Sequence, residues 1–233
     1  MGSETEVKRL GVLGGTFDPP HYGHLLLADT ARVQLQLDRV LFAPAGQPPH
    51  KPSDQPSPAT HRVAMLQAAL ADADEPTFHL SRLDLDRPGP HYTVDALTIL
   101  HKVYPTAEMW FLIGGDSLRD LPQWRNPTRI ITLARLAALG RPGYTPNLDQ
   151  LATKLPTTDE PVNLSQRVDW LAGPPLDVSS SALRERARRG LPLRYLVPPS
   201  VEAYAREHGL YDGREKNWDV RRFSRSTLQG KSV

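Results

Sequence analysis

The chain has 233 residues, of which 39% are hydrophobic and 23% are charged, and its formal net charge is +2. This composition is typical of a folded domain and excludes the disordered and membrane-spanning classes. The absence of cysteine excludes disulfides, thiolate nucleophiles and cysteine-bound zinc. The polar N-terminus and the lack of a long apolar run predict a cytoplasmic protein with no membrane partner, and the weak net charge predicts no nucleic-acid partner.

From residue 7 onward, short apolar runs alternate with amphipathic segments. Strands are predicted over 7–13, 39–46, 77–85, 107–115, 133–140 and 168–173. Helices are predicted over 24–37, 61–70, 92–104, 179–190 and 198–211, with Gly190 and Gly209 as the stops of the last two. This alternation predicts an α/β fold: a Rossmann-like, doubly wound, mostly parallel sheet with helices on both faces. Ligands of such sheets bind beyond the carboxyl ends of the strands.

The organisation along the chain predicts one domain over residues 1–212, with a helical C-terminal part over about 179–212. Apolar periodicity ends past residue 212, so 213–233 is expected to be a mobile basic tail. The proline-rich segment 47–58 continues neither a strand nor a helix. It is a candidate loop for closing over a substrate.

The stretch "GGTFDPPHYGHL" (14–25) joins the first predicted strand to the first predicted helix. It matches neither a P-loop nor a dinucleotide fingerprint. Gly14 and Gly15 allow close approach of a ligand to the backbone, and His21 and His24 lie one helical turn apart. Imidazoles beside a helix start can donate hydrogen bonds to phosphoryl oxygens. A zinc site would need a third ligand, which is not nearby, so no metal-binding side chain is predicted. The remaining alternative to phosphate binding is that His21 and His24 are ordinary polar residues on the surface of a turn.

Two motifs resemble those of the nucleotidylyltransferase superfamily: "HYGH" (21–24) and "VSSSALR" (178–184). Independently of the resemblance, serines at a helix start cap free amides, and Arg184 projects back toward that end. The resemblance implies that His21, His24 and Arg184 act on the phosphates of ATP, which binds together with Mg²⁺. Further residues implied in ATP binding are Gly14, Gly15, Thr16, Phe17, Asp116, Ser180 and Ser181.

Within the superfamily, several stretches between about 7 and 212 resemble bacterial nicotinate-nucleotide adenylyltransferases. They are "PAGQPPHK" (44–51), "HYTVDAL" (91–97), "IGGDSLRDLPQWRN" (113–126), "GRPGY" (140–144) and "LVPPSVEAYAREHGLY" (196–211). The resemblance implies adenylyl transfer from ATP to nicotinate mononucleotide in NAD biosynthesis, with release of pyrophosphate. Trp124 can stack on a pyridine ring, and amides near Tyr92 and Thr93 can receive a carboxylate. Lys51 and Arg141 are candidates for the anionic groups of the acceptor.

Other functions stay open at this point. A triple serine (179–181), where the family commonly has threonine third, also occurs in phosphopantetheine adenylyltransferases, and Leu183 replaces a common isoleucine. His21 and Trp124 argue against that enzyme. A class I aminoacyl-tRNA synthetase fragment would share the His-x-Gly-His feature, but the chain has no KMSKS-like segment. A non-catalytic nucleotide sensor on the same fold is a further alternative, because a fold does not fix a function.

Overall fold

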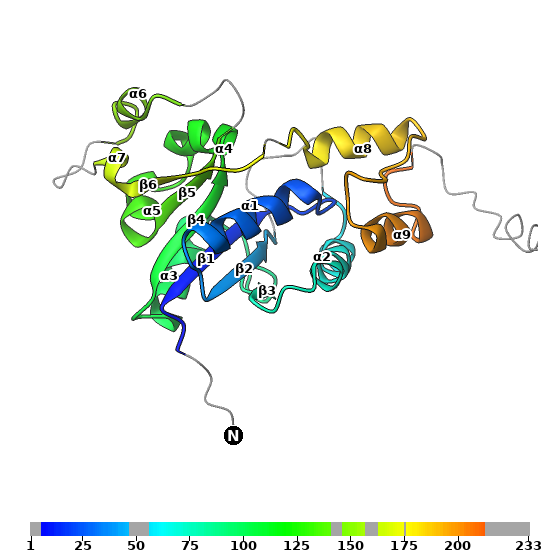
Figure 1. Ribbon diagram of the computed structural model, residues 1–233, viewed down its shortest axis with the longest axis horizontal. Coiled ribbons are helices and arrows are strands. Elements are labelled where there is room, and N and C mark those ends of the chain that lie inside the picture. Colours follow the sequence, from blue (N-terminus) through cyan, green and yellow to red (C-terminus); the bar gives the residue numbers. More distant parts are fainter. Residues whose placement is uncertain (1–5, 47–55, 141–145, 157–162, 175, 213–233) are drawn as a thin grey trace, which may run out of the picture.

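The computed structural model describes residues 6–46, 56–140, 146–156, 163–174 and 176–212. Within these ranges, six strands form one sheet in the order β3-β2-β1-β4-β5-β6, and every neighbouring pair is parallel (Figure 1). The strands are β1 (Arg9–Gly15), β2 (Arg39–Pro44), β3 (Phe78–Leu80), β4 (Glu108–Gly114), β5 (Arg135–Leu139) and β6 (Val168–Leu171). The predicted doubly wound α/β sheet is therefore confirmed, and its described strands are all parallel.

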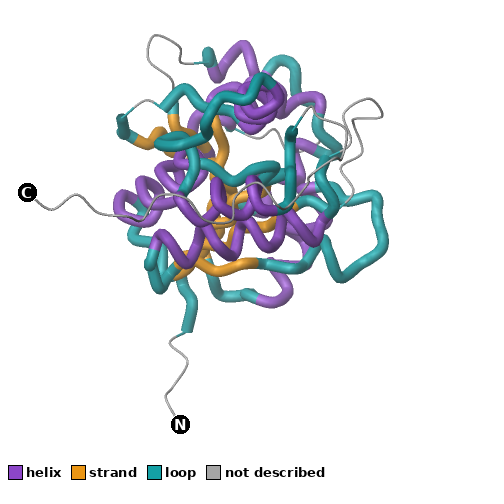
Figure 2. Tube along the Cα trace, turned by 90° about the vertical axis from the view of Figure 1, so that its right-hand side faces the viewer, coloured by secondary structure: helices purple, strands orange, loops and turns teal. Residues whose placement is uncertain are grey.

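Helices cover both faces of the sheet, and Figure 2 shows the strands enclosed among them. The described helices are α1 (Tyr22–Gln34), α2 (Ala59–Ala73), α3 (Thr93–Val103), α4 (Gly115–Asp120), α5 (Pro127–Leu133), α6 (Leu148–Ala152), α7 (Leu164–Arg167), α8 (Ser180–Arg188) and α9 (Pro199–Glu207), with a 3₁₀ turn η1 (Leu121–Gln123). The five predicted helices correspond to α1, α2, α3, α8 and α9. The short helices α4 to α7 were not predicted, because four to seven residues do not establish a helical period.

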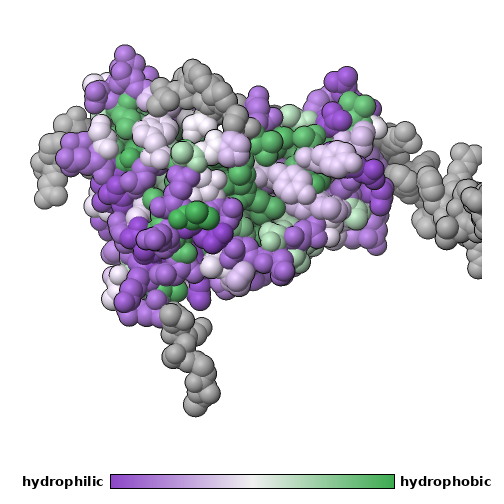
Figure 3. All heavy atoms as spheres, in the orientation of Figure 1, coloured by the Kyte–Doolittle hydropathy of each residue, from purple (hydrophilic) through white to green (hydrophobic). Residues whose placement is uncertain are grey.

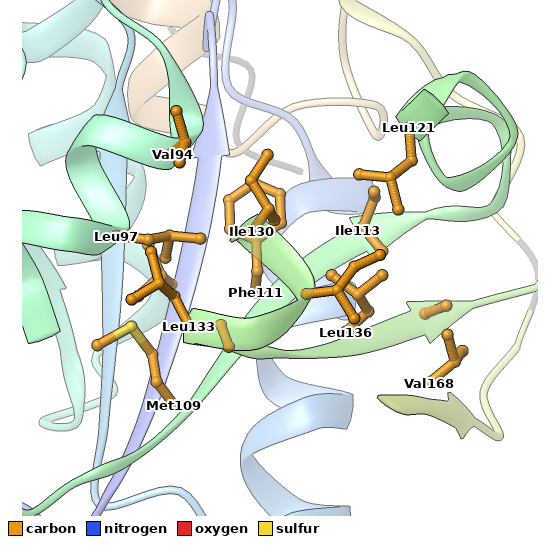
Figure 4. Close-up of a cluster of buried hydrophobic side chains, with 14 of the residues drawn as sticks. Val94, Leu97, Met109, Phe111, Ile113, Leu121, Ile130, Leu133, Leu136 and Val168 are labelled. Carbon is orange, nitrogen blue, oxygen red and sulfur yellow. The ribbon is translucent and has the colours of Figure 1, made fainter. Parts of the chain in front are cut away.

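Three apolar clusters hold these layers together. On one face of the sheet, side chains of α3 and α5 pack on β4, β5 and β6, as Val94, Leu97, Phe111, Ile130 and Leu136 show in Figure 4. The opposite face is covered by side chains of α1 and α2. A third cluster joins α2 to α8 and α9, so the C-terminal helices are anchored beside the sheet. The single domain over residues 1–212 stays a prediction, and the tail 213–233 lies outside the described residues.

The register of the sheet places two glycine-ended strands side by side. β1 ends at Gly14 and Gly15, which pair with Ala43 and Pro44 of β2, and β4 ends at Gly114. The strand order reverses between β1 and β4, since β2 and β3 lie on one side and β5 and β6 on the other. A doubly wound sheet opens a crevice for ligands at this switch point, beyond the carboxyl ends of the strands.

The outer surface and the helix lengths complete the fold. Hydrophilic residues make up most of the face shown in Figure 3, with small groups of apolar residues among them. None of the described helices has the length and apolar character of a membrane span. Gly190 and Gly209 follow α8 and α9 with φ of 69° and 58°, which confirms both as left-handed helix stops.

Candidate active site

Two adjoining cavities open at the switch point of the sheet. The first has a volume of about 470 Å³ and lies between the β1–α1 turn, the end of β4 and the start of α8. The second, of about 330 Å³, reaches toward the start of α3. Both are lined by Gly14, Gly15, Thr16, Phe111, Ser117 and Trp124. Two ligands bound in these cavities would therefore meet over the glycine end of β1.

The first cavity gathers every residue that the sequence suggested for ATP. Its lining includes Gly14, Gly15, Thr16, Phe17, His21, His24, Asp116, Ser180, Ser181 and Arg184. These residues come from β1, the following turn, α1, α4 and α8, and they span about 170 positions of the chain. Their common location is a finding of the structure, whereas their roles stay predictions.

The two histidines lie against each other at the start of α1. His21 occupies the N-cap position, and its ring stacks on that of His24 with centroids 3.7 Å apart. Gly23 makes this possible, because a Cβ there would lie 3.0 Å from Nδ1 of His21. Phe17 packs against His24 from below the turn, with a centroid distance of 4.8 Å, and has a φ of 51°. A left-handed Phe17 that is fully buried marks a turn held in place by its surroundings.

Hydrogen bonding fixes the tautomer of His24. The backbone N–H of His21 donates to Nδ1 of His24 at 3.1 Å, so a neutral His24 carries its proton on Nε2. Burial lowers the pKa of His24 well below its usual value, and the nearby His21 lowers that pKa further. Burial also lowers the pKa of His21 to about 4. At neutral pH both imidazoles are therefore uncharged, and His24 presents an N–H donor to a ligand.

The start of α8 faces the same turn. The hydroxyl of Ser179 accepts a hydrogen bond from the amide of Ala182, which confirms the predicted capping serine. Ser180 behaves differently, because its hydroxyl donates to the carbonyl of Pro19 at 2.9 Å. Nη1 of Arg184 donates to the carbonyl of Asp18 at 2.9 Å, so this side chain does project back toward the start of its own helix. The start of α8 is thus hydrogen-bonded to the turn that leads into α1.

The second cavity gathers the described residues suggested for the acceptor. Tyr92 is the N-cap of α3, Thr93 is its first residue, and both line the cavity together with Trp124. The indole of Trp124 is half-buried and meets the ring of Phe111 edge-on, with centroids 5.8 Å apart. Lys51, Arg141 and most of the loop 47–58 lie outside the described residues.

Beneath the turn lies a buried polar network that the sequence analysis missed. Asp18 and Arg62 are each 1% exposed. The carboxylate of Asp18 accepts from the hydroxyl of Tyr211 at 2.6 Å and from the amide of Ser57 at 2.9 Å. The guanidinium of Arg62 donates to the carbonyls of Thr16 and Ser57, both at 2.9 Å. Burial lowers the pKa of Arg62, and the charge of Asp18 opposes that shift.

One signal in the sequence could have revealed Arg62. It lies within the apolar segment "RVAML", on a helix whose neighbouring side chains are buried. A charged residue on the buried face of a helix needs a partner elsewhere in the fold. Tyr211 carries no such signal, because its partner Asp18 is 193 positions away.

Comparison with known proteins identifies the family of the chain. Residues 12–186 match the model of the cytidylyltransferase-like family. The chain belongs to this family. A relative from Thermomicrobium roseum, named a probable nicotinate-nucleotide adenylyltransferase, is 46% identical over 205 residues, covering 88% of this chain and 92% of the relative. A relative of the same name from Corynebacterium kroppenstedtii is 40% identical over 211 residues, covering 91% of this chain and 94% of its own length.

A solved structure of an adenylyltransferase shares the fold of this chain. It is the nicotinic acid mononucleotide adenylyltransferase of Plasmodium falciparum, in complex with NaAD. It is 17% identical to this chain and superposes with a TM-score of 0.70, covering 88% of this chain and 97% of its own. The recognised resemblance to the nucleotidylyltransferase superfamily and the predicted α/β fold are both confirmed by these comparisons.

We expect Tyr211→Phe to destabilise this cytidylyltransferase-like chain. The substitution removes a hydrogen bond from a buried carboxylate and leaves one of its oxygens unpaired, which costs about 1–3 kcal/mol. Chemical denaturation would measure the loss, with Tyr195→Phe as the matched control because Tyr195 is 84% exposed. Equal stabilities of the two variants would contradict the role of the Tyr211 hydroxyl.

Stability should also fall as the pH falls from about 6.5 toward 4. His21 has a folded-state pKa of about 4 because it is buried, so the unfolded chain takes up its proton first as the solution is acidified. Between pH 7.5 and pH 5 the loss from His21 is about 2 kcal/mol, and this contribution is constant above about pH 7. The measurement is the free energy of unfolding against pH for the unmodified chain, His21→Gln and His101→Gln. The first substitution should flatten the slope in this window, and the second, at an exposed histidine, should not.

Proposed function

We propose that this chain transfers the adenylyl group of ATP to nicotinate mononucleotide, giving nicotinate adenine dinucleotide and pyrophosphate in the cytoplasmic synthesis of NAD. The observation that carries the proposal is the pair of adjoining cavities. One is lined by His21, His24 and Arg184, which suit a triphosphate, and the other by Trp124 and the start of α3, which suit a carboxylated pyridine. The names of the bacterial relatives support the same reaction.

The reaction needs alignment and charge stabilisation more than covalent help from the protein. A phosphate oxygen of the mononucleotide attacks the α-phosphorus of ATP, and the bond from that phosphorus to the α,β-bridging oxygen breaks. Pyrophosphate leaves with the bonding electron pair. In this scheme Nε2–H of His24 donates to a phosphoryl oxygen, and Arg184 and the amides at the start of α8 receive negative charge. Gly14 and Gly15 let the two substrates meet without an intervening side chain.

The first cavity also suits a magnesium ion held on the triphosphate. Asp116, in the first turn of α4, is the one carboxylate among the described residues that line it. Mg²⁺ commonly binds one or two carboxylates together with substrate phosphates and water, and the donor set fits this pattern. When bound, the ion supplies charge neutralisation to the phosphates. Asp116 would then position the triphosphate through the ion.

The first test is pyrophosphate release from ATP with three acceptors in parallel: nicotinate mononucleotide, nicotinamide mononucleotide and phosphopantetheine. We expect release with the first acceptor and much less with the second, because a carboxylate gains more than an amide from the amides that begin α3. Release with phosphopantetheine alone would contradict the acceptor and the stacking role of Trp124. No release with any acceptor, together with measurable ATP binding, would instead support a nucleotide sensor.

We expect His24→Ala to lower kcat by about 10²-fold or more, because it removes a hydrogen-bond donor aimed at developing charge. His24→Asn is the sharper variant. Its side chain has an oxygen near the position of Nδ1 and can keep the bond from the His21 amide, but it has no donor at the position of Nε2. Both variants should lose activity alike, whereas His101→Ala, at an exposed position on α3, should not. A folded Asn variant with normal turnover would refute the donor role.

A further inference from the structure

The second cavity contains a cation that the sequence analysis did not single out. Arg125 follows Trp124 in the loop after η1, and it is an exposed residue that lines the cavity. Its guanidinium carbon lies 4.4 Å from the centroid of the Tyr92 ring, which is a cation–π arrangement. Tyr92 is the N-cap of α3. The guanidinium is therefore held at the same end of the cavity as the first amides of that helix.

The two charged side chains of this cavity differ in whether they are already paired. Asp84 and Arg125 are the acidic and basic side chains among its described lining residues, apart from His91. The carboxylate of Asp84 is already paired with Arg87, at 2.7 Å. Within the described part of the chain Arg125 forms no ion pair, and its guanidinium lies over the Tyr92 ring. A cation without a counter-charge, in the wall of a cavity, favours an anionic ligand group there.

The contact with Tyr92 also limits the positions open to the guanidinium. An arginine that is already ordered loses less conformational freedom when it binds a carboxylate, and its planar donors match the two carboxylate oxygens. The helix end adds donors and a partial positive charge from the same side. Trp124, the preceding residue, lines both cavities, so a ring stacked on it would lie next to this positive end.

We propose that Arg125 is a specificity-determining residue, whose guanidinium binds the carboxylate of the pyridine ring and so selects the acid over the amide. This inference rests on the proposed function. A neutral carboxamide of the same shape gains nothing from the charge of Arg125, whereas the ribose and the phosphate are common to both acceptors. The effect of Arg125 is therefore confined to the contrast between the two acceptors.

The test compares kcat/KM for nicotinate mononucleotide and nicotinamide mononucleotide in the full chain, with ATP saturating. Arg125→Gln should lower the value for the acid at least tenfold, mainly through KM, and change the value for the amide by less than about twofold. Arg125→Lys keeps the charge but not the planar fork, and should retain part of the preference. The matched control is Arg129→Gln, an exposed arginine on α5 that lines neither cavity, and it should change neither value.

Two results would overturn the inference. An equal fall for both acceptors in Arg125→Gln would assign the guanidinium to the shared ribose or phosphate, and an unchanged ratio would leave the selection to the α3 amides alone. Activity with the amide reports whether the variant is folded, so a misfolded variant is not mistaken for a selective one. Failure of the proposed function is distinguishable, because the unmodified chain would then show no activity with nicotinate mononucleotide.

Discussion

The turn between β1 and α1 depends on two buried charges that lie beneath it. Asp18 and Arg62 are almost fully buried, and a buried charge is tolerated only when it is paired and hydrogen-bonded. Arg62 satisfies this condition by holding backbone carbonyls of the turn and of residue 57, and Asp18 satisfies it with Tyr211. The position of His21 and His24 is therefore determined by α2 and by the segment after α9, as well as by their own helix.

Hydrogen bonds to the same turn also hold the start of α8 beside His21 and His24. Arg184 donates to the carbonyl of Asp18 and Ser180 donates to the carbonyl of Pro19, so α8 is attached to the backbone of the turn itself. The apolar cluster between α2, α8 and α9 also packs α8 against the rest of the fold. Any movement of α8 relative to the sheet would break these bonds together, which favours a first cavity that is formed before the ligand arrives.

The sequence predicted most of the fold, because alternating strands and helices leave few topologies for a parallel sheet. The predicted strand bounds were less accurate, because pairing with neighbouring strands decides how far each strand extends. The first strand was expected over 7–13 and is found at Arg9–Gly15, since pairing with β2 extends it through both glycines. The segment 77–85 is a strand only at Phe78–Leu80, because β3 is an edge strand that pairs with β2 alone. The site motifs were recognisable because each lies in one contiguous stretch, whereas Tyr211 and Arg125 gain their roles from contacts with distant residues.

The two cavities also differ in the groups that supply hydrogen-bond donors and positive charge to a ligand. In the first, both imidazoles are neutral at pH 7, because burial lowers their pKa values, and the positive contributions come from Arg184 and from helix ends. Neutral donors avoid the desolvation cost of buried imidazolium ions, and they still strengthen their hydrogen bonds as negative charge develops on a phosphoryl group. In the second cavity the cation is the exposed side chain of Arg125, which lies over the Tyr92 ring. Under the proposed function, transition-state stabilisation and acceptor selection would therefore fall to different kinds of group, on either side of the glycine end of β1.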